Sequence, residues 1–282
     1  MRGYCLAGAL LALLLGSERA QAQDAAPEGT AGPATAVDAV AGDPPATPPD
    51  QAPPGKDHWE FKAIGYLWLA GTKGTADVIK PVAPVDFDLS IGDVLHALQF
   101  AVMGAAEAQK DRVVFLGDFA FFHLAFRKGI GIRDPDFATA SLDLRTAEVT
   151  LLGGYRVVNN GPLKVDLLAG GRMNSFKIAM QLQGPAREAD GTIKRTWVDP
   201  IIAARVVAPL SEKWSLSLYG DVGGFGLGSH ITWQAAPTIN WAISHKTSVG
   251  AGWRYLKVDY RNGDVLYNVG LSGPVIDFRT AL

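Results

Sequence analysis

From residue 59 to the end of the chain, apolar and polar residues alternate one by one over long stretches. In the first stretch Trp59, Phe61 and Ala63 fall on one face, and Glu60 and Lys62 fall on the other. Successive side chains of a β-strand point to opposite faces of the sheet, so this pattern predicts strands with one apolar and one polar face. Helical spacing of apolar residues is weak throughout the same region.

The alternation predicts about ten strands. They fall at residues 59–70, 98–109, 112–126, 138–158, 162–182, 191–208, 213–227, 229–243, 246–260 and 264–278. The stretch 72–97 has two interpretations. It forms either a short hairpin around 71–87, which would make twelve strands, or an external excursion that ends in a short helix at 91–98. Both counts are even, as in bacterial outer-membrane barrels.

Three features favour a membrane barrel over a soluble β-sandwich, whose strands also alternate. The strands are longer than the five or six residues that are typical of soluble sheets. Their polar faces carry charge in mid-strand. Tight connections, such as 211–212, alternate with longer polar ones near 127–137 and 183–192. Short periplasmic turns opposite long external loops are typical of outer-membrane barrels, and closure leaves no backbone group unpaired in lipid. We therefore expect an all-β fold, an up-and-down antiparallel transmembrane barrel over residues 58–282.

The first 22 residues predict a secretory signal peptide. Arg2 supplies positive charge, residues 6–15 are apolar, and Ala20-Gln21-Ala22 fits a cleavage site. Ten apolar residues are too few to span about 30 Å of hydrocarbon as a helix. Cys5 is the one cysteine of the chain, so the mature protein would contain none.

Residues 23–57 predict a disordered, Pro/Ala-rich periplasmic linker. This segment holds eight of the 17 prolines and no aromatic residue, so it cannot bury enough apolar surface to offset the entropy of ordering it. It is interpreted either as a passive spacer or as a tether that binds the cell wall or a periplasmic protein.

Composition narrows the partners. The net charge is −2, and there is no concentration of Lys and Arg of the kind that nucleic-acid binding requires. We therefore expect no nucleic-acid partner. The expected partners are outer-membrane lipid and the barrel-assembly machinery, in the cell outer membrane of a Gram-negative bacterium.

Several segments resemble a family of uncharacterised proteobacterial outer-membrane β-barrel proteins. The segments are YLWLAG at 66–71, MGAAEA at 103–108, WVDP at 197–200, DVGGFGLGS at 221–229, WRYLKVDY at 253–260 and GP at 273–274. The resemblance covers most of 59–278. It implies a small barrel in the outer membrane and no established reaction, hence no catalytic residues.

If the aliphatic faces meet lipid, the polar faces line the lumen. The predicted lumen network consists of Glu107, Asp118, Glu148, Asp166, Arg172, Asp199, Arg205, Asp221 and Arg254, with Glu60, Lys62, Arg156 and Lys164 on the same faces. Side chains fill the lumen of a barrel of about this size, and unpaired buried charges are costly. The charges therefore predict either a plug of ion pairs or the selectivity constriction of a narrow pore.

Aromatic residues near the strand ends predict a membrane girdle, in which amphipathic rings sit at the lipid headgroups. The predicted girdle residues are Trp59, Tyr155, Trp214 and Trp241.

Candidate chemistry is sparse. The five histidines form no metal-binding motif, and there is no G-x-S-x-G elbow, so we expect no metal, no cofactor and no catalytic residue. The weighed alternative is a lipid-modifying enzyme at the barrel rim, with His123 beside Asp118 or His230 beside Ser229. The expected function is a non-enzymatic barrel with a structural or narrow-channel role; the alternatives are the periplasmic tether and the rim enzyme.

Overall fold

The computed structural model describes residues 58–77, 85–126, 139–159, 161–183, 188–263 and 265–282. The predicted signal peptide and the predicted linker lie outside the described residues.

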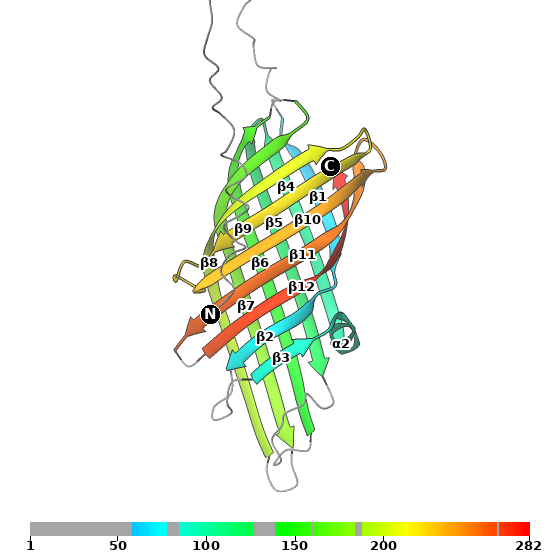
Figure 1. Ribbon diagram of the computed structural model, residues 1–282. Helices are drawn as coiled ribbons and strands as arrows, with labels where there is room; N and C mark the ends of the chain where they lie inside the picture. Colours follow the sequence, from blue (N-terminus) through cyan, green and yellow to red (C-terminus); the bar gives the residue numbers. More distant parts are fainter. Residues whose placement is uncertain (1–57, 78–84, 127–138, 160, 184–187, 264) are drawn as a thin grey trace, which may run out of the picture. The chain divides into compact units, whose positions relative to one another are not determined.

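Ten antiparallel strands close into a barrel, in which the last strand pairs with the first (Figure 1). These strands are β1 (Glu60–Trp68), β4 (Leu98–Lys110), β5 (Val113–Phe126), β6 (Thr139–Val158), β7 (Lys164–Gln183), β8 (Glu188–Pro209), β9 (Trp214–Gly223), β10 (Ile231–Ala242), β11 (Thr247–Asn262) and β12 (Val265–Ala281). Each strand pairs with its neighbours in sequence, apart from the β1–β4 step and the closing pair. The predicted fold class, a closed up-and-down barrel of about ten strands, is confirmed.

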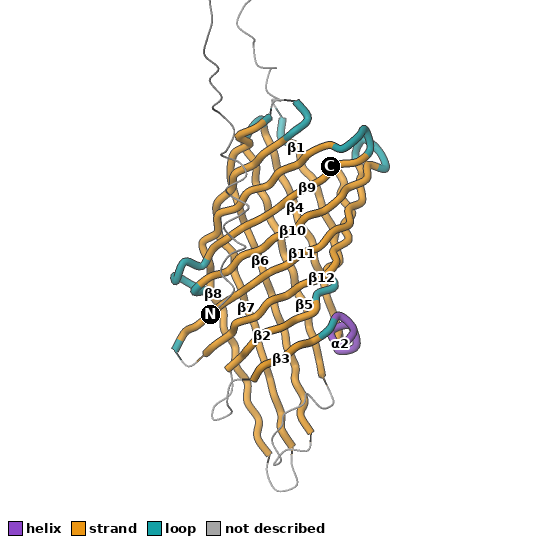
Figure 2. Tube along the Cα trace, in the orientation of Figure 1, coloured by secondary structure: helices purple, strands orange, loops and turns teal. Residues whose placement is uncertain are grey.

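Both interpretations of the stretch 72–97 are present in the structure. Strands β2 (Gly71–Asp77) and β3 (Val85–Leu89) form a hairpin that extends the sheet along β12, and helix α2 (Ile91–Ala97) follows it (Figure 2). A capping box starts the helix, because Ser90 and Asp93 each bond the backbone N–H of the other. The hairpin and the helix lie outside the closed ring of ten.

Three predicted boundaries differ from the structure by three residues or more, and one of them is the end of β12, at Ala281 rather than at 278. Strand β9 ends at Gly223 rather than at 227, because Gly224, Phe225 and Gly226 adopt positive φ and turn the chain, with Gly226 N–H bonded to the Ser229 carbonyl. Strand β8 begins at Glu188, so the connection expected at 183–192 is shorter than predicted. Positive φ is common for glycine and unfavourable for a residue such as phenylalanine. The turn lies within a sequence whose apolar and polar residues alternate as in a strand, so the alternation alone does not reveal it.

The connections at the two ends of the barrel differ. Residues 111–112, 210–213 and 243–246 join strands tightly, and the end of β12 lies at the same end of the barrel (Figure 1). Strands β2 and β3, helix α2 and the turn 224–230 lie at the other end. Outer-membrane barrels place short turns in the periplasm, so we assign the tight-turn end to the periplasm. Among the described residues, no helix is both long enough and apolar enough to cross a membrane.

An apolar belt covers the outer face of the barrel between its two ends. Leu151 is 65% exposed and Val198 60%, and Leu167 and Ile202 on adjacent strands are also exposed. Such exposure would be costly in water, but it suits a surface that contacts hydrocarbon.

The belt predicts that the cost of a charge depends on depth. Leu151 lies midway along the outward positions of β6 between Val157 and Arg145, so Leu151→Arg should destabilise the barrel in lipid vesicles by about 2–4 kcal/mol. Val157→Arg, on the same face of the same strand but near the periplasmic turn, should cost about 0–1 kcal/mol. Urea unfolding in vesicles measures both. Equal costs for the two variants would contradict the assigned belt.

Candidate functional site

The periplasmic half of the lumen contains a cluster of ion pairs. Asp166 accepts hydrogen bonds from Arg156 (Nε to Oδ1, 2.7 Å) and from Arg205 (Nη2 to Oδ2, 2.7 Å). Arg205 reaches across the barrel to Glu107 (2.7 Å), which also pairs with Lys62 at 3.3 Å. We call these five residues the periplasmic cluster. Asp166 is fully buried, and because its two guanidinium partners compensate its charge, this desolvated carboxylate is tolerated.

A second cluster fills the middle of the lumen around two arginines. Arg172 Nη2 lies 2.6 Å from Asp221 Oδ2, and Arg172 Nε lies 3.7 Å from Glu148. Arg254 Nη2 lies 3.0 Å from Glu148 and 3.3 Å from Asp118. We call these five residues the central cluster.

Neutral side chains add hydrogen bonds to the central cluster, although Asp221 Oδ1 is buried without a hydrogen-bond partner. The Tyr66 hydroxyl accepts a bond from Arg254 Nη1 (2.8 Å), and Gln234 accepts one from Arg254 Nε (3.0 Å). The Tyr219 hydroxyl donates to Asp221, and the guanidinium of Arg254 lies 4.6 Å from the ring centroid of Trp68. Connected polar networks of this kind are rigid, because each member orients the next.

Asp199, which the sequence placed in the network, lies apart from both clusters. Its carboxylate is fully buried and accepts hydrogen bonds from Asn174, Trp197 and Ser229, all of them neutral donors. The Ser229 backbone N–H also donates to it. Asp199 therefore anchors the 224–230 turn to β8, and no cation of the described chain pairs with it.

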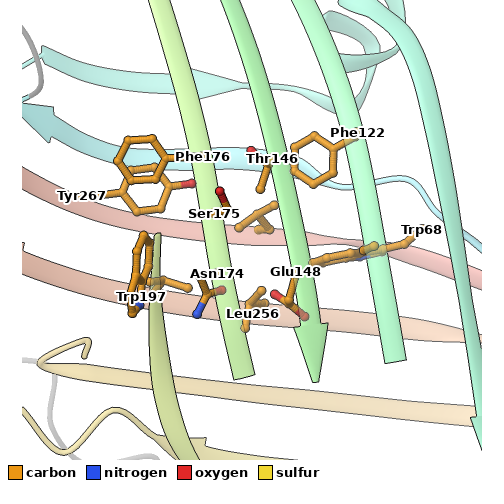
Figure 3. Close-up of a pocket in the computed structure, with 13 residues that line it drawn as sticks. Trp68, Phe122, Thr146, Glu148, Asn174, Ser175, Phe176, Trp197, Leu256 and Tyr267 are labelled. Carbon is orange, nitrogen blue, oxygen red and sulfur yellow. The ribbon is translucent and has the colours of Figure 1, made fainter. Parts of the chain in front are cut away.

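Apart from Asn174 and Asp199, the external half of the lumen is packed mainly with apolar side chains, contrary to the expectation of a charged lumen throughout. Phe176, Trp197, Tyr260 and Tyr267 form a stack of rings, with centroids 4.1 Å apart for Trp197–Tyr260 and 4.8 Å apart for Phe176–Tyr267. Figure 3 shows Phe176, Tyr267 and Trp197 grouped on one side of a cavity, and Glu148 and Trp68 on the other. We call the four stacked residues the aromatic cluster.

Two small cavities lie beside these clusters. The cavity between the aromatic and central clusters has a volume of about 30 Å³, and a second one of about 40 Å³ lies under α2, against Trp68, Met103 and Phe122. Each is large enough for a small number of water molecules.

Lys164, Glu60 and one further ion pair also belong to the lumen faces. Lys164 forms none of the ion pairs seen in the described chain, whereas Glu60 does have an interaction partner. One buried pair was missed: Asp277, 5% exposed, binds Arg279 Nε at 2.6 Å near the periplasmic end of β12. The expected strand stopped at 278, but extending the alternation by one residue would have placed Arg279 on the face of Asp277.

The predicted girdle residues lie on the outer face near the periplasmic end. Trp214 and Trp241 stack at 6.3 Å, Trp59 contacts the ring of Phe115 at 6.0 Å, and Tyr155 is 51% exposed. Sequence reasoning missed two aromatic pairs nearer the external end, which are Trp233–Tyr255 at 4.7 Å and Phe100–Phe121 at 5.9 Å.

Both histidine pairings weighed for a rim enzyme are wrong. Asp118 points into the lumen, whereas His123 is on the opposite face of β5 and binds Asp143 of β6 instead (Nε2 to Oδ2, 2.6 Å). His230 is exposed, whereas Ser229 is buried against Asp199. Alternation separates adjacent strand residues onto opposite faces, and only the register between β5 and β6 brings Asp143 to His123.

No protein-family model matches the chain, and no curated protein matches it either. Solved structures do. The outer membrane protease OmpT from Escherichia coli aligns with a TM-score of 0.51 at 10% identity, over 82% of this chain and 99% of that one. The translocator domain of the autotransporter NalP from Neisseria meningitidis aligns at 0.40 with 13% identity, over 82% and 90%. The attachment invasion locus protein Ail of Yersinia pestis aligns at 0.33 with 11% identity, over 78% and 97%.

The likeness to OmpT shows the fold alone. Together with the closed ring of strands and the outward apolar belt, it makes the chain an outer-membrane β-barrel, located in the outer membrane of a Gram-negative bacterium.

Proposed function

We propose that this protein is a structural, non-conducting barrel of the outer membrane, with a lumen closed by packed side chains. The observation that carries the proposal is the filling of the lumen at three successive levels. The periplasmic cluster, the central cluster and the aromatic cluster follow one another along the barrel, and the two cavities beside them have volumes of only about 30 and 40 Å³.

Charge balance supports a plug rather than a selectivity constriction. The two ion-pair clusters contain five carboxylates, Glu107, Asp118, Glu148, Asp166 and Asp221, and five cations, Lys62, Arg156, Arg172, Arg205 and Arg254. A selective pore needs charges that are free to replace the hydration of a passing ion. Here the charges neutralise one another.

A bilayer recording tests the proposal. The full-length mature protein, inserted into planar bilayers, should give no resolved conductance steps above the protein-free baseline. Reproducible steps with a preference for cations or anions would contradict the plug and favour the narrow channel.

A lipid-modifying enzyme at the rim is the second candidate, favoured by the His123–Asp143 contact on the outer face. A carboxylate that orients an imidazole is one part of a hydrolytic site. Release of fatty acid from outer-membrane lipids, abolished in His123→Ala and retained in His230→Ala, would support it. Equal activity of both variants, or none in the wild type, would contradict it.

A further inference from the structure

Four basic residues form one row across the outer face of the barrel. The strand register pairs His123 of β5 with Arg145 of β6, Arg145 with Lys177 of β7, and Lys177 with Lys194 of β8. Adjacent strands lie about 4.8 Å apart, so neighbouring members of the row are within reach of one ligand headgroup. We call these four residues the basic row.

The basic row begins where the apolar belt ends. On each of its four strands, counted outward from the periplasmic turn, the member of the row is the first ionisable side chain other than tyrosine on the outer face. Four residues nearer the periplasm, the matching outward row is the apolar set Phe119, Val149, Met173 and Val198.

The alternation reverses at the same level. Within the belt β7 carries Leu167 outward and Arg172 inward, but beyond it Lys177 is outward while Phe176 and Ile178 are buried inside. A sheet that turns its polar face outward has left hydrocarbon for a polar medium. The basic row therefore lies at the headgroups of the outer leaflet.

The two lysines of the row are available to a ligand. Lys177 and Lys194 are exposed and form no ion pair within the described chain. The other two members share Asp143, which lies 2.6 Å from His123 and 3.3 Å from Arg145. The three permanent cations Arg145, Lys177 and Lys194, set against the carboxylate of Asp143, give this surface two net positive charges.

We propose that the basic row binds the phosphate groups of the bisphosphorylated glycolipid headgroup of the outer leaflet, the lipid A type of headgroup. Phosphate oxygens are the matching partners for Lys and Arg. Strands of such barrels tilt by roughly 35–45°, so three strand spacings spread the row over about 9 Å of depth. That spread suits a headgroup with phosphates on a sugar scaffold better than the single phosphate layer of a glycerophospholipid.

Outward residues on the periplasmic side of the basic row complete the proposed lipid-binding site. The exposed Phe100 and the half-buried Phe121 form an aromatic pair beside His123, and acyl chains of the same lipid would pack on Val149 and Met173. Between the cations and the apolar row, Ser175 and Thr196 bond each other on the outer face, at the level of the sugar hydroxyls.

Binding of purified lipid A to the detergent-solubilised full-length protein tests the inference. The test variant is Lys177→Gln/Lys194→Gln, and the matched control is Lys213→Gln/Lys246→Gln, which removes two exposed lysines at periplasmic turns. A Lys near an anionic membrane surface contributes enough that losing two should raise the Kd roughly thirtyfold. The control should bind like the wild type.

Two further probes use the wild-type protein, so they do not depend on any variant folding. Lipid A stripped of both phosphates should bind far more weakly than the bisphosphorylated form. Phosphatidylglycerol should compete poorly. Unchanged binding in Lys177→Gln/Lys194→Gln, equal binding of dephosphorylated lipid A, or full competition by phosphatidylglycerol would each overturn the inference.

Discussion

Arg254→Ala is expected to lower the free energy of unfolding of the barrel by about 3–5 kcal/mol, the range found when one partner of a buried charge network is removed. Arg254 is 5% exposed and is the residue through which the central cluster is joined. Its guanidinium group bonds Glu148, Gln234 and Tyr66 and lies against the ring of Trp68. Alanine leaves Glu148 with Arg172 alone, at 3.7 Å.

The lost stability of Arg254→Ala should come from buried carboxylates left without a cation rather than from lost packing. Arg254→Ala combined with Glu148→Gln and Asp118→Asn removes the unpaired charges, so the triple variant should regain part of the stability. Lys213→Ala, at an exposed periplasmic turn, should be near the wild type.

Urea unfolding in vesicles, followed by tryptophan fluorescence, measures all three variants. Planar-bilayer recording on the same samples reports whether removing Arg254 opens a path for ions. If Arg254→Ala and Lys213→Ala have the same free energy of unfolding and the same conductance, the central cluster does not close the lumen.

The alternation along the chain was enough to predict the architecture of the barrel. A transmembrane strand must separate lipid-facing from lumen-facing residues. The alternation therefore shows which face of each strand meets lipid, and all ten strands of the ring could be located. Partners across the lumen could not be predicted in the same way. Arg254 meets Glu148, 106 positions away, only because the closed ring brings β6 opposite β11, and no local pattern encodes that meeting.

Asp199 and the aromatic cluster show where the reasoning from the sequence failed. Every inward position was treated as polar, yet beyond the lipid boundary the same strands place Trp197 and Phe176 inside and Lys177 outside. The reversal of alternation is visible in the sequence, since Lys177 and Lys194 stand at outward positions. The rule that apolar residues face outward holds only within the membrane, and these strands extend past it.

The reversal makes a second large effect testable. Trp197 is 9% exposed, stacks on Tyr260 at 4.1 Å and meets Phe176 edge-on at 5.8 Å. Its indole N–H is shared between Asp199 (3.0 Å) and Ser229 (2.8 Å). Trp197→Ala should therefore cost about 3–5 kcal/mol, the range for removing a large aromatic side chain from a packed core.

Two comparisons separate the packing of Trp197 from its hydrogen bonds. Trp197→Phe keeps a ring in the aromatic cluster but removes the N–H, so its cost should be nearer 1–3 kcal/mol, the cost of an unsatisfied buried partner. Trp214→Ala removes an indole that is 48% exposed on the outer face and should cost less than Trp197→Ala.

Because Asp199 also anchors the 224–230 turn, protease cleavage within that turn should accelerate in Trp197→Ala and stay unchanged in Trp214→Ala. Equal losses for the two alanine variants would mean that the external half of the lumen is not a packed core, and the lumen would then be closed by its ion pairs alone.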